Sequence, residues 1–240
     1  MMKIALLGYG KMGKEVEKIS IAKHSQIILK VNSENSSIIT PEQLKKADIA
    51  IEFSRPEVAF QNVIKCFEAG IPVVCGTTGW QSELEKVKQI CLDGDHTFFY
   101  ARNFSIGVNI FFHLNKELAK IMDLYTSYNP SVKEIHHIHK VDSPSGTAIQ
   151  LANDIIGRMT GKSAWINGPQ ETNNQVSIES LREDEVPGTH LVTYHSSIDD
   201  IVITHEAHNR EGFAAGAFLA AEWVIEKKGI FGMSDLLQLY

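Results

Sequence analysis

The stretch KIALLGYGKMG, residues 3–13, decides the fold of the first half of the chain. Its apolar beginning predicts a short strand, and the pattern from Met12 to Ile21 predicts a helix. The glycines between them follow the spacing G-x-G-x-x-G. In this spacing Gly8 permits a tight turn, Gly10 leaves room for a pyrophosphate near the backbone, and Gly13 lets the helix pack on the strand. We therefore expect a dinucleotide-binding loop that opens a helix.

The rest of the first hundred residues alternates between strand and helix patterns. Further strands are predicted at residues 27–31, 49–53, 72–75 and 97–100. Three capping boxes, Thr40–Gln43, Ser54–Glu57 and Ser82–Glu85, predict the starts of the intervening helices. This alternation indicates an α/β domain with a Rossmann-type, doubly wound parallel sheet, in which the carboxyl ends of the strands share one edge.

The rhythm changes after residue 104. Helices are predicted at 108–122 and 146–159, and strands at 132–137, 175–181, 190–195 and 201–207. Few helices separate the later strands, which is typical of an α+β domain with a mixed or antiparallel sheet. A helix at 213–227 returns to the first type of pattern. We therefore predict a dinucleotide-binding domain at 1–104 plus 213–240 and a substrate-binding and oligomerisation domain at 105–212, with hinge connections at 101–109 and 209–212.

Composition and charge restrict the partners. The 240 residues are 43% hydrophobic and 22% charged, as in an ordinary globular protein, and the net charge is −6. Such a chain does not bind nucleic acid or an anionic membrane through general electrostatic attraction. An anionic small molecule would need positive charge concentrated at one place.

Several features favour a cytoplasmic protein. The apolar stretch from Phe213 to Ile225 is broken by Gly216 and Glu222 and is shorter than the ~20 residues of a membrane span. The apolar run at residues 4–7 is too short for the core of a signal peptide. The three cysteines are not clustered, which favours reduced, buried thiols over disulfides.

The end of the second predicted strand bears on the choice of dinucleotide. An acidic residue at this position binds the ribose hydroxyls of NAD and repels the extra phosphate of NADP. Here the strand is followed by Asn32 and Ser33, and Lys11 can lie near a 2′-phosphate. NADP is therefore tolerated, and NAD remains open.

Three of the ten histidines, His136, His137 and His139, fall within four positions and precede Lys140. Partly exposed polar histidines and a zinc site are both alternatives. If the segment continues as a strand, His137 and His139 share one face and His136 lies on the other, so at most two of them could easily bind one metal. We favour the interpretation that histidine and lysine supply protons and positive charge, with no metal.

A helix is predicted to begin directly after this cluster, at Ser145-Gly146-Thr147. Its free N–H groups, with the Thr147 hydroxyl, form an anion site suited to a carboxylate. Cations, proton donors and a helix N-terminus within about a dozen residues supply the local positive site that an acidic protein requires.

These residues resemble a known family. The run HHIHKVDSPSGTA, residues 136–148, strongly resembles the signature of 4-hydroxy-tetrahydrodipicolinate reductase, also called dihydrodipicolinate reductase. The glycine loop, GTTG at 76–79, NFSIGVN at 103–109 and the helix starting at Phe213 also fit, so the resemblance covers the whole chain. The chain departs from the family pattern at Lys11, where many members have arginine. Its glycine loop is also the compact G-x-G-x-x-G, where the longer G-x-x-G-R-M-G is often seen.

The resemblance implies a two-domain enzyme of lysine and diaminopimelate biosynthesis, an oxidoreductase that is usually a homotetramer built through the C-terminal sheets. It implies reduction of a cyclic dicarboxylate with hydride from NADH or NADPH, His136 as proton donor or acceptor, and Lys140 as proton donor. It places substrate at His137, Gly146 and Thr147. It places the dinucleotide at Gly8, Tyr9, Gly10, Lys11, Met12, Gly13, Gly76, Thr77, Thr78, Ala101, Arg102, Asn103 and Phe104.

Three other functions remain as alternatives to this expectation. One is a Rossmann oxidoreductase that acts on a sugar or an amino acid. Another is a dinucleotide-sensing regulator without catalysis, which would not need the histidine–lysine cluster. The third is a zinc hydrolase that uses the histidines.

Overall fold

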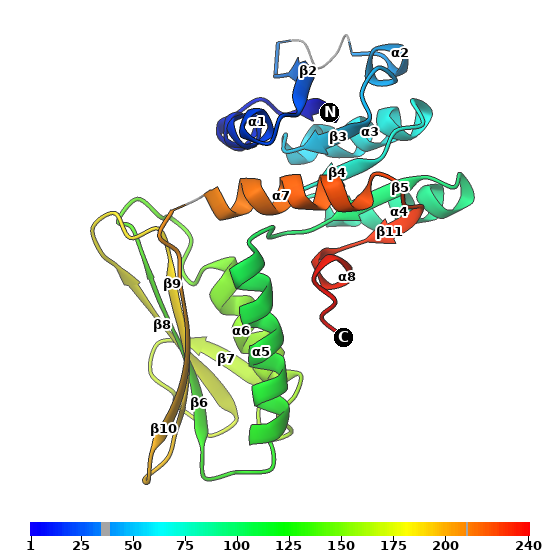
Figure 1. Cartoon of the computed structure of the whole chain (residues 1–240). Coiled ribbons are helices and arrows are strands. Elements are labelled where there is room, and N and C mark those ends of the chain that lie inside the picture. Colours follow the sequence, from blue (N-terminus) through cyan, green and yellow to red (C-terminus); the bar gives the residue numbers. More distant parts are fainter. Residues whose placement is uncertain (35–38, 210) are drawn as a thin grey trace. The chain divides into compact units, whose positions relative to one another are not determined.

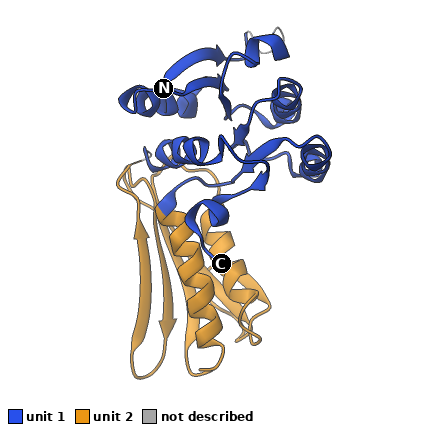
Figure 2. Cartoon of the chain, turned by 45° about the vertical axis from the view of Figure 1, so that its right-hand side comes forward, with its two compact units in different colours: residues 1–106, 211–240 blue, residues 107–210 orange. Residues whose placement is uncertain are grey.

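The computed structural model describes residues 1–34, 39–209 and 211–240. The chain divides into two compact units, residues 1–106 with 211–240 and residues 107–210 (Figure 2). The predicted boundaries, after residue 104 and before residue 213, lie close to these. Residue 210, in the second predicted connection, is outside the described residues.

Unit 1 contains a parallel sheet, with strand order β11-β5-β4-β3-β1-β2 (Figure 1). Six strands are found in the described part of this unit: β1 (Lys3–Leu7), β2 (Gln26–Val31), β3 (Ile49–Glu52), β4 (Val73–Cys75), β5 (Thr97–Tyr100) and β11 (Gly229–Phe231). The helices of the unit are α1 (Lys11–Ala22), α2 (Pro41–Leu44), α3 (Pro56–Glu68), α4 (Leu84–Asp93), α7 (Glu211–Val224) and α8 (Met233–Leu237), with a short 3₁₀ helix at Gln81–Glu83.

Helices cover both faces of this sheet because the strands carry apolar side chains on both faces. Ala5 and Leu7 of β1 face the core shared with α3 and α4, whereas Ile4 and Leu6 face the core shared with α1 and α7. A strand that is apolar on both faces is typical of a parallel sheet between two helical layers. The predicted doubly wound α/β architecture is therefore confirmed.

Unit 2 contains a mixed sheet, with strand order β10-β9-β6-β8-β7. Its strands are β6 (Asn129–His136), β7 (Ala164–Asn167), β8 (Gln175–Arg182), β9 (Thr189–His195) and β10 (Asp200–Glu206). β6 pairs parallel with β8 and antiparallel with β9. Helices α5 (Ile106–Met122) and α6 (Gly146–Ile156) pack on one face, where Val132, Ile178 and Tyr194 form the core with them. The predicted α+β unit with a mixed sheet is confirmed.

Local details correct several expectations. The capping box at Thr40 is present, with Gln43 at the reciprocal position. The boxes at Ser54 and Ser82 are absent: α3 begins after Arg55 with Pro56 at its first turn, and α4 follows the 3₁₀ helix. The predicted strand through His137 ends at His136. Strands β7 and β11 and helix α8 were not predicted from the sequence.

Two further expectations concern the thiols and membrane spans. The three cysteines are free and buried. Burial raises the pKa of the Cys91 thiol to about 11, and it also raises the pKa values of Cys66 and Cys75. These thiols are therefore protonated and unreactive at neutral pH. Within the described ranges, we find no helix of the length and apolarity that a membrane crossing requires.

Candidate functional site

The glycine loop lies between β1 and α1, at the carboxyl edge of the sheet in unit 1. Gly8 adopts φ +102°, and a Cβ there would lie 2.1 Å from the carbonyl oxygen of Phe53. A Cβ at Gly13 would lie 2.4 Å from the carbonyl oxygen of Gly8, so the start of α1 packs directly on the turn. A Cβ at Gly10 would meet no described atom within 4 Å. The loop therefore leaves open space at the one glycine where the sequence pattern predicts a pyrophosphate.

Neighbouring loops meet the glycine loop around Phe53. A Cβ at Gly76 would lie 2.1 Å from the Phe53 ring, and the ring centroid of Phe104 is 5.6 Å from that of Phe53. The Ser54 amide donates to the Thr77 hydroxyl over 2.8 Å. The loops that follow β1, β3, β4 and β5 thus converge at one edge, which the parallel order of the strands requires. We call residues 8–13, 53–55, 76–78 and 101–104 the carboxyl edge.

A pocket of about 240 Å³ opens beside the glycine loop. It is lined by residues from the carboxyl edge, the end of β2 and the first turns of α3: Gly8, Tyr9, Gly10, Val31, Asn32, Ser33, Phe53, Ser54, Arg55, Val58 and Asn62. This pocket brings Asn32 and Ser33 to the glycine loop, as the sequence predicts. Phe53, Ser54, Arg55, Val58 and Asn62 were missed, because the segment after β3 carries no recognised nucleotide motif.

The other residues predicted to bind the dinucleotide differ in their exposure to solvent. Lys11, Thr78 and Arg102 are exposed, Met12, Gly76 and Asn103 are half-buried, and Thr77, Ala101 and Phe104 are buried. The Phe104 ring stacks on Phe99 and belongs to the core, so only its backbone can face a ligand. The Tyr9 hydroxyl donates to Glu17, which also pairs with Lys30 at 2.6 Å. None of the residues at 76–78 or 101–104 lines the described pocket.

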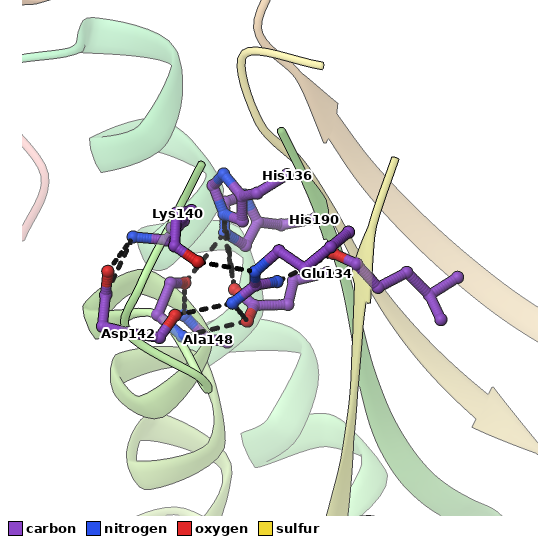
Figure 3. A network of polar contacts seen from close by, with 9 residues as sticks. Glu134, His136, Lys140, Asp142, Ala148 and His190 are labelled. Carbon is purple, nitrogen blue, oxygen red and sulfur yellow. Dashed lines mark hydrogen bonds and ion pairs between the residues drawn. The ribbon is translucent and has the colours of Figure 1, made fainter. Parts of the chain in front are cut away.

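In unit 2 the register of the sheet assembles a set of polar side chains from separate strands. Glu134 on β6 lies opposite His190 on β9, and His136 lies opposite Arg182 on β8. Glu134 and His136 point to the same face because they are two residues apart in a strand. Ser145, the N-cap of α6, approaches from that face. We call Glu134, His136, Ser145, Arg182 and His190 the polar cluster (Figure 3).

The contacts in the polar cluster are short and shielded from water. Glu134 is fully buried, and the exposed fractions of the His136 and His190 side chains are 11% and 5%. Nε2 of His136 lies 3.3 Å from Oε2 of Glu134 and 3.3 Å from Nε2 of His190. Oε1 of Glu134 accepts the Ser145 amide over 3.0 Å and lies 3.6 Å from the Arg182 guanidinium.

These contacts fix the charges of the cluster. Burial alone would raise the pKa of the Glu134 carboxyl, but hydrogen bonds from His136 and Ser145 outweigh burial and hold that pKa well below its usual range. Burial lowers the pKa of His190 to about 4, assisted by the neighbouring His136 and opposed by Glu134. Glu134 is therefore ionised and His190 neutral at physiological pH.

Lys140 lies in the loop after β6. Its ammonium pairs with Asp142 at 2.7 Å, and this hydrogen bond lowers the pKa of Asp142. The Arg182 guanidinium makes two hydrogen bonds to the backbone of this loop. Nε donates to the Lys140 carbonyl over 3.3 Å, and a terminal nitrogen donates to the Asp142 carbonyl over 2.6 Å. Arg182 thus connects the loop of Lys140 to the polar cluster (Figure 3).

The predicted division of the histidines between two faces of a strand is wrong, because the chain turns after His136. His137 is half-buried, and its ring centroid lies 6.1 Å from that of His139. His139 is exposed beside Glu185 at 3.2 Å. The geometry therefore separates His136 from the other two histidines, and among the described residues His137 and His139 do not belong to a group of three side chains compact enough to hold a metal ion.

Gly146 and Thr147 form the first turn of α6, as predicted. The Ser145 hydroxyl accepts the Ala148 amide over 3.1 Å, and a Cβ at Gly146 would meet no described atom within 4 Å. The amides of Gly146 and Thr147 precede the first intrahelical hydrogen bonds, so this end of the helix presents donors and a partial positive charge.

The group Glu134, His136 and His190 is compact enough to be considered for a metal ion, since one ligand atom from each lies within 4.8 Å of the others. We do not assign it as a metal site. The Ser145 amide and the Arg182 guanidinium already supply positive partners to the carboxylate through Oε1, and Nε2 of each histidine lies within 3.7 Å of Oε2, so the buried charge is balanced by side chains.

Sequence reasoning assigned no role to three members of the polar cluster, Glu134, Arg182 and His190. Glu134 could have been found, because period-two alternation places it on the face of His136. Arg182 and His190 depend on strand pairing across more than forty residues, for which the sequence gives no local signal. The position of Ser145 at the helix start was predicted, but its contact with Glu134 was not.

A dinucleotide-type sheet joined to a separate unit that carries acid–base side chains defines the class, a two-unit oxidoreductase of Rossmann type. A family model described as "Dihydrodipicolinate reductase, N-terminus" matches residues 2–104, and one described as "Dihydrodipicolinate reductase, C-terminus" matches residues 107–237. The chain therefore belongs to the dihydrodipicolinate reductase family.

Individual relatives agree with this assignment. The chain is 47% identical over 238 residues to the 4-hydroxy-tetrahydrodipicolinate reductase of Christiangramia forsetii, covering 98% of both chains. It is 33% identical to the enzyme of the same name from Rickettsia rickettsii, covering 100% of both. The solved structure described as dipicolinate-bound dihydrodipicolinate reductase from Paenisporosarcina sp. TG-14 shares the fold, with a TM-score of 0.77, 20% identity and 97% coverage of both chains.

Proposed function

We propose that this chain reduces 4-hydroxy-tetrahydrodipicolinate to tetrahydrodipicolinate in diaminopimelate and lysine biosynthesis. One observation carries the proposal: in unit 2, the family signature places Lys140, His136 and the N-terminus of α6 around a single loop. Positive charge and proton donors are thereby concentrated in a chain whose net charge is −6. A sugar or amino-acid dehydrogenase, a dinucleotide sensor and a zinc hydrolase are less consistent with this family and this cluster.

The carboxyl edge is the part of unit 1 that fits a nicotinamide dinucleotide. The open space at Gly10 and the start of α1 suit a pyrophosphate, and the adjoining pocket suits a nucleoside. When bound, NADH or NADPH supplies the hydride. We assign the binding of its phosphates to the backbone at Gly8–Gly13, with Tyr9, Lys11 and Met12 in the same loop. The loops at 76–78 and 101–104 would border the remainder of the dinucleotide.

The lining of the pocket supports tolerance of NADPH. Asn32, Ser33 and Arg55 lie where a ribose 2′ substituent would be read, and no carboxylate is found among the described lining residues. An acidic side chain would repel a 2′-phosphate, whereas a guanidinium attracts one. Michaelis constants for NADH and NADPH test this point, and a hundredfold preference for NADH would contradict it.

Substrate binding and proton transfer are assigned to unit 2. A cyclic dicarboxylate needs two anion-binding groups, for which we propose the amides of Gly146 and Thr147, and His137. Loss of the substrate hydroxyl with a hydrogen of the neighbouring carbon, as water, gives a conjugated C=C–C=N system. Addition of hydride to that system leaves an electron-rich intermediate that takes up one proton. Lys140 or His136 donates that proton, and a well-placed general acid contributes about 10²–10⁴-fold to the rate. Lys140 pairs with Asp142 at 2.7 Å beside the N-terminus of α6.

A coupled assay tests the function. Dihydrodipicolinate synthase supplies the unstable substrate, and oxidation of NADH and of NADPH is followed by absorbance. We expect turnover that depends on the synthase product. Oxidation that does not depend on that product, or turnover with sugars or amino acids instead, would contradict the proposal.

Assembly and location complete the proposal. We propose a cytoplasmic homotetramer formed through the sheets of unit 2. Helices α5 and α6 cover one face of that sheet, and on β10 the apolar side chains of Ile201 and Val202 are 37% and 49% exposed in the single chain. Light scattering coupled to size exclusion measures the mass in solution, and a monomeric mass would contradict this assembly.

A further inference from the structure

The polar cluster contains a buried carboxylate that the proposed reaction does not use. Glu134 does not lie at the surface, where substrate could reach it, yet it is ionised and contacts both His136 and the residue that begins α6. A buried charge is costly unless its partners are specific. Such a buried carboxylate is expected to orient the groups that it contacts, here His136 and the start of α6.

The distances around Glu134 favour one arrangement of protons. Oε2 of Glu134 accepts no regular hydrogen bond from the described residues, and the nearest nitrogen is Nε2 of His136 at 3.3 Å. Nε2 of His136 and Nε2 of His190 also lie 3.3 Å apart, so only one of the two carries a hydrogen. A hydrogen on Nε2 of His136 lies between two acceptors, the carboxylate and the bare Nε2 of His190, and the Ser145 hydroxyl then donates to that same His190 nitrogen over 3.3 Å.

We propose that Glu134 is a positioning residue that fixes His136 with Nε2–H directed at the carboxylate, so that Nδ1 is the nitrogen that exchanges protons with substrate. This inference rests on the proposed function, because it assigns the working atom of the same site. In an imidazole, the hydrogen bond made by one ring nitrogen determines the state of the other. The arrangement corresponds to a buried carboxylate that orients a catalytic histidine.

Two further contacts restrict the ring. Gly188, in the loop before β9, packs so closely that a Cβ there would lie 2.9 Å from Cε1 of His136. Glu134 also accepts a hydrogen bond from the amide of Ser145, the N-cap of α6, over 3.0 Å. The proposed proton-exchanging nitrogen and the proposed carboxylate-binding amides are thus fixed relative to each other by one side chain.

The charged and titratable groups near the His136 and His190 rings come from several elements. Glu134 belongs to β6, Arg182 to β8, His205 to β10, and Lys140 and Asp142 to the loop after β6. Of these, Glu134 supplies the only negative charge among the described groups that directly contacts His136. Glu134 raises the pKa of His190, so removing this charge makes protonation of His190 less favourable.

The first experiment uses the unaltered protein. Imidazole ¹⁵N chemical shifts distinguish the two neutral tautomers, and the His136 resonances are assigned by their loss in His136→Asn. We expect neutral His136 to carry its hydrogen on Nε2. A predominant Nδ1–H tautomer would overturn the inference. Because this measurement does not depend on turnover, it decides the inference even if the reductase assay fails.

The second experiment links the cluster to catalysis. Glu134→Gln keeps an acceptor for the Ser145 amide but removes the charge. We expect kcat to fall about tenfold or more, the basic limb of the pH–rate profile to move down by about 1–3 units, and the KM for the nucleotide to stay unchanged. Glu179→Gln, an exposed carboxylate that pairs with Lys133 at 3.2 Å, is the control.

A purely structural role for Glu134 predicts a different result. In that case Glu134→Gln lowers activity equally at all pH values and leaves the tautomer of His136 unchanged. If the variant does not fold, the tautomer of the unaltered protein still decides. A folded variant whose pH profile matches that of Glu179→Gln would overturn the inference.

Discussion

The carboxyl edge of unit 1 and the polar cluster of unit 2 are built in opposite ways. At the carboxyl edge the important groups are backbone atoms and open spaces, set by glycines a few residues apart. In the polar cluster they are charged side chains from β6, β8, β9 and the start of α6, brought together by strand register. The first site depends on local geometry, and the second on the tertiary structure.

This difference matches the ligand that we propose for each site. A pyrophosphate is met by unpaired N–H groups and a helix dipole, for which side chains are an obstruction. Proton transfer to a substrate needs titratable groups in set protonation states, which only burial and neighbouring charges supply. Substitutions that remove a charged or titratable side chain in unit 2 should therefore change the catalytic rate or the pH dependence of stability. Glycine-to-alanine substitutions in unit 1, which add one methyl group, should change stability or dinucleotide affinity.

The largest effect is expected for Lys140→Ala. It removes the proposed proton donor, so we expect kcat to fall by about 10²-fold or more, with the fold intact. Lys133→Ala is the matched control, since Lys133 is a half-buried lysine that forms an ion pair with the exposed Glu179 at 3.2 Å. Steady-state kinetics at saturating nucleotide measure both. Near-native turnover in Lys140→Ala would remove Lys140 from the mechanism.

The same comparison explains what the sequence could predict. The sheet of unit 1, with five of the strands described here, follows from apolar runs punctuated by glycines such as Gly8 and Gly76. Strand β11 was missed because Gly229–Phe231 is too short to show a period and gains its stability from pairing with β5. The sequence motif singled out His136 and Lys140, whose catalytic roles stay predictions. It did not single out His190 and Arg182, because their contacts come from a strand register that no local pattern encodes.

The next largest effect concerns stability and pH in unit 2. Burial lowers the pKa of His190 to about 4, so between pH 6.5 and 4 the unfolded chain binds a proton that the folded chain does not. Stability is therefore lost as the pH falls through this range. Over two pH units the His190 contribution amounts to about 2–3 kcal/mol. Urea unfolding at pH 6.5 and 4.5 measures the loss.

His190→Gln isolates this contribution. Its free energy of unfolding should fall less between the two pH values than that of the unaltered protein. His195→Gln is the control, because His195 lies on the same strand but is exposed beside Asp200. Equal pH dependence in His190→Gln and the unaltered protein would show that His190 is not held neutral by the fold.

The smallest effects are expected for alanine substitutions at two glycines of the carboxyl edge, Gly13 and Gly10. A methyl group at Gly13 would lie 2.4 Å from the Gly8 carbonyl oxygen, so Gly13→Ala should lower stability by about 1–3 kcal/mol. A methyl group at Gly10 enters open space, so Gly10→Ala should leave the unfolding midpoint unchanged and raise the dinucleotide dissociation constant about tenfold, or about 1.4 kcal/mol. Thermal unfolding and fluorescence titration with NADPH separate the two effects. If Gly10→Ala bound NADPH as tightly as the unaltered protein, the space at Gly10 would not be where the phosphates lie, and the pocket beside it would have to hold a different part of the dinucleotide.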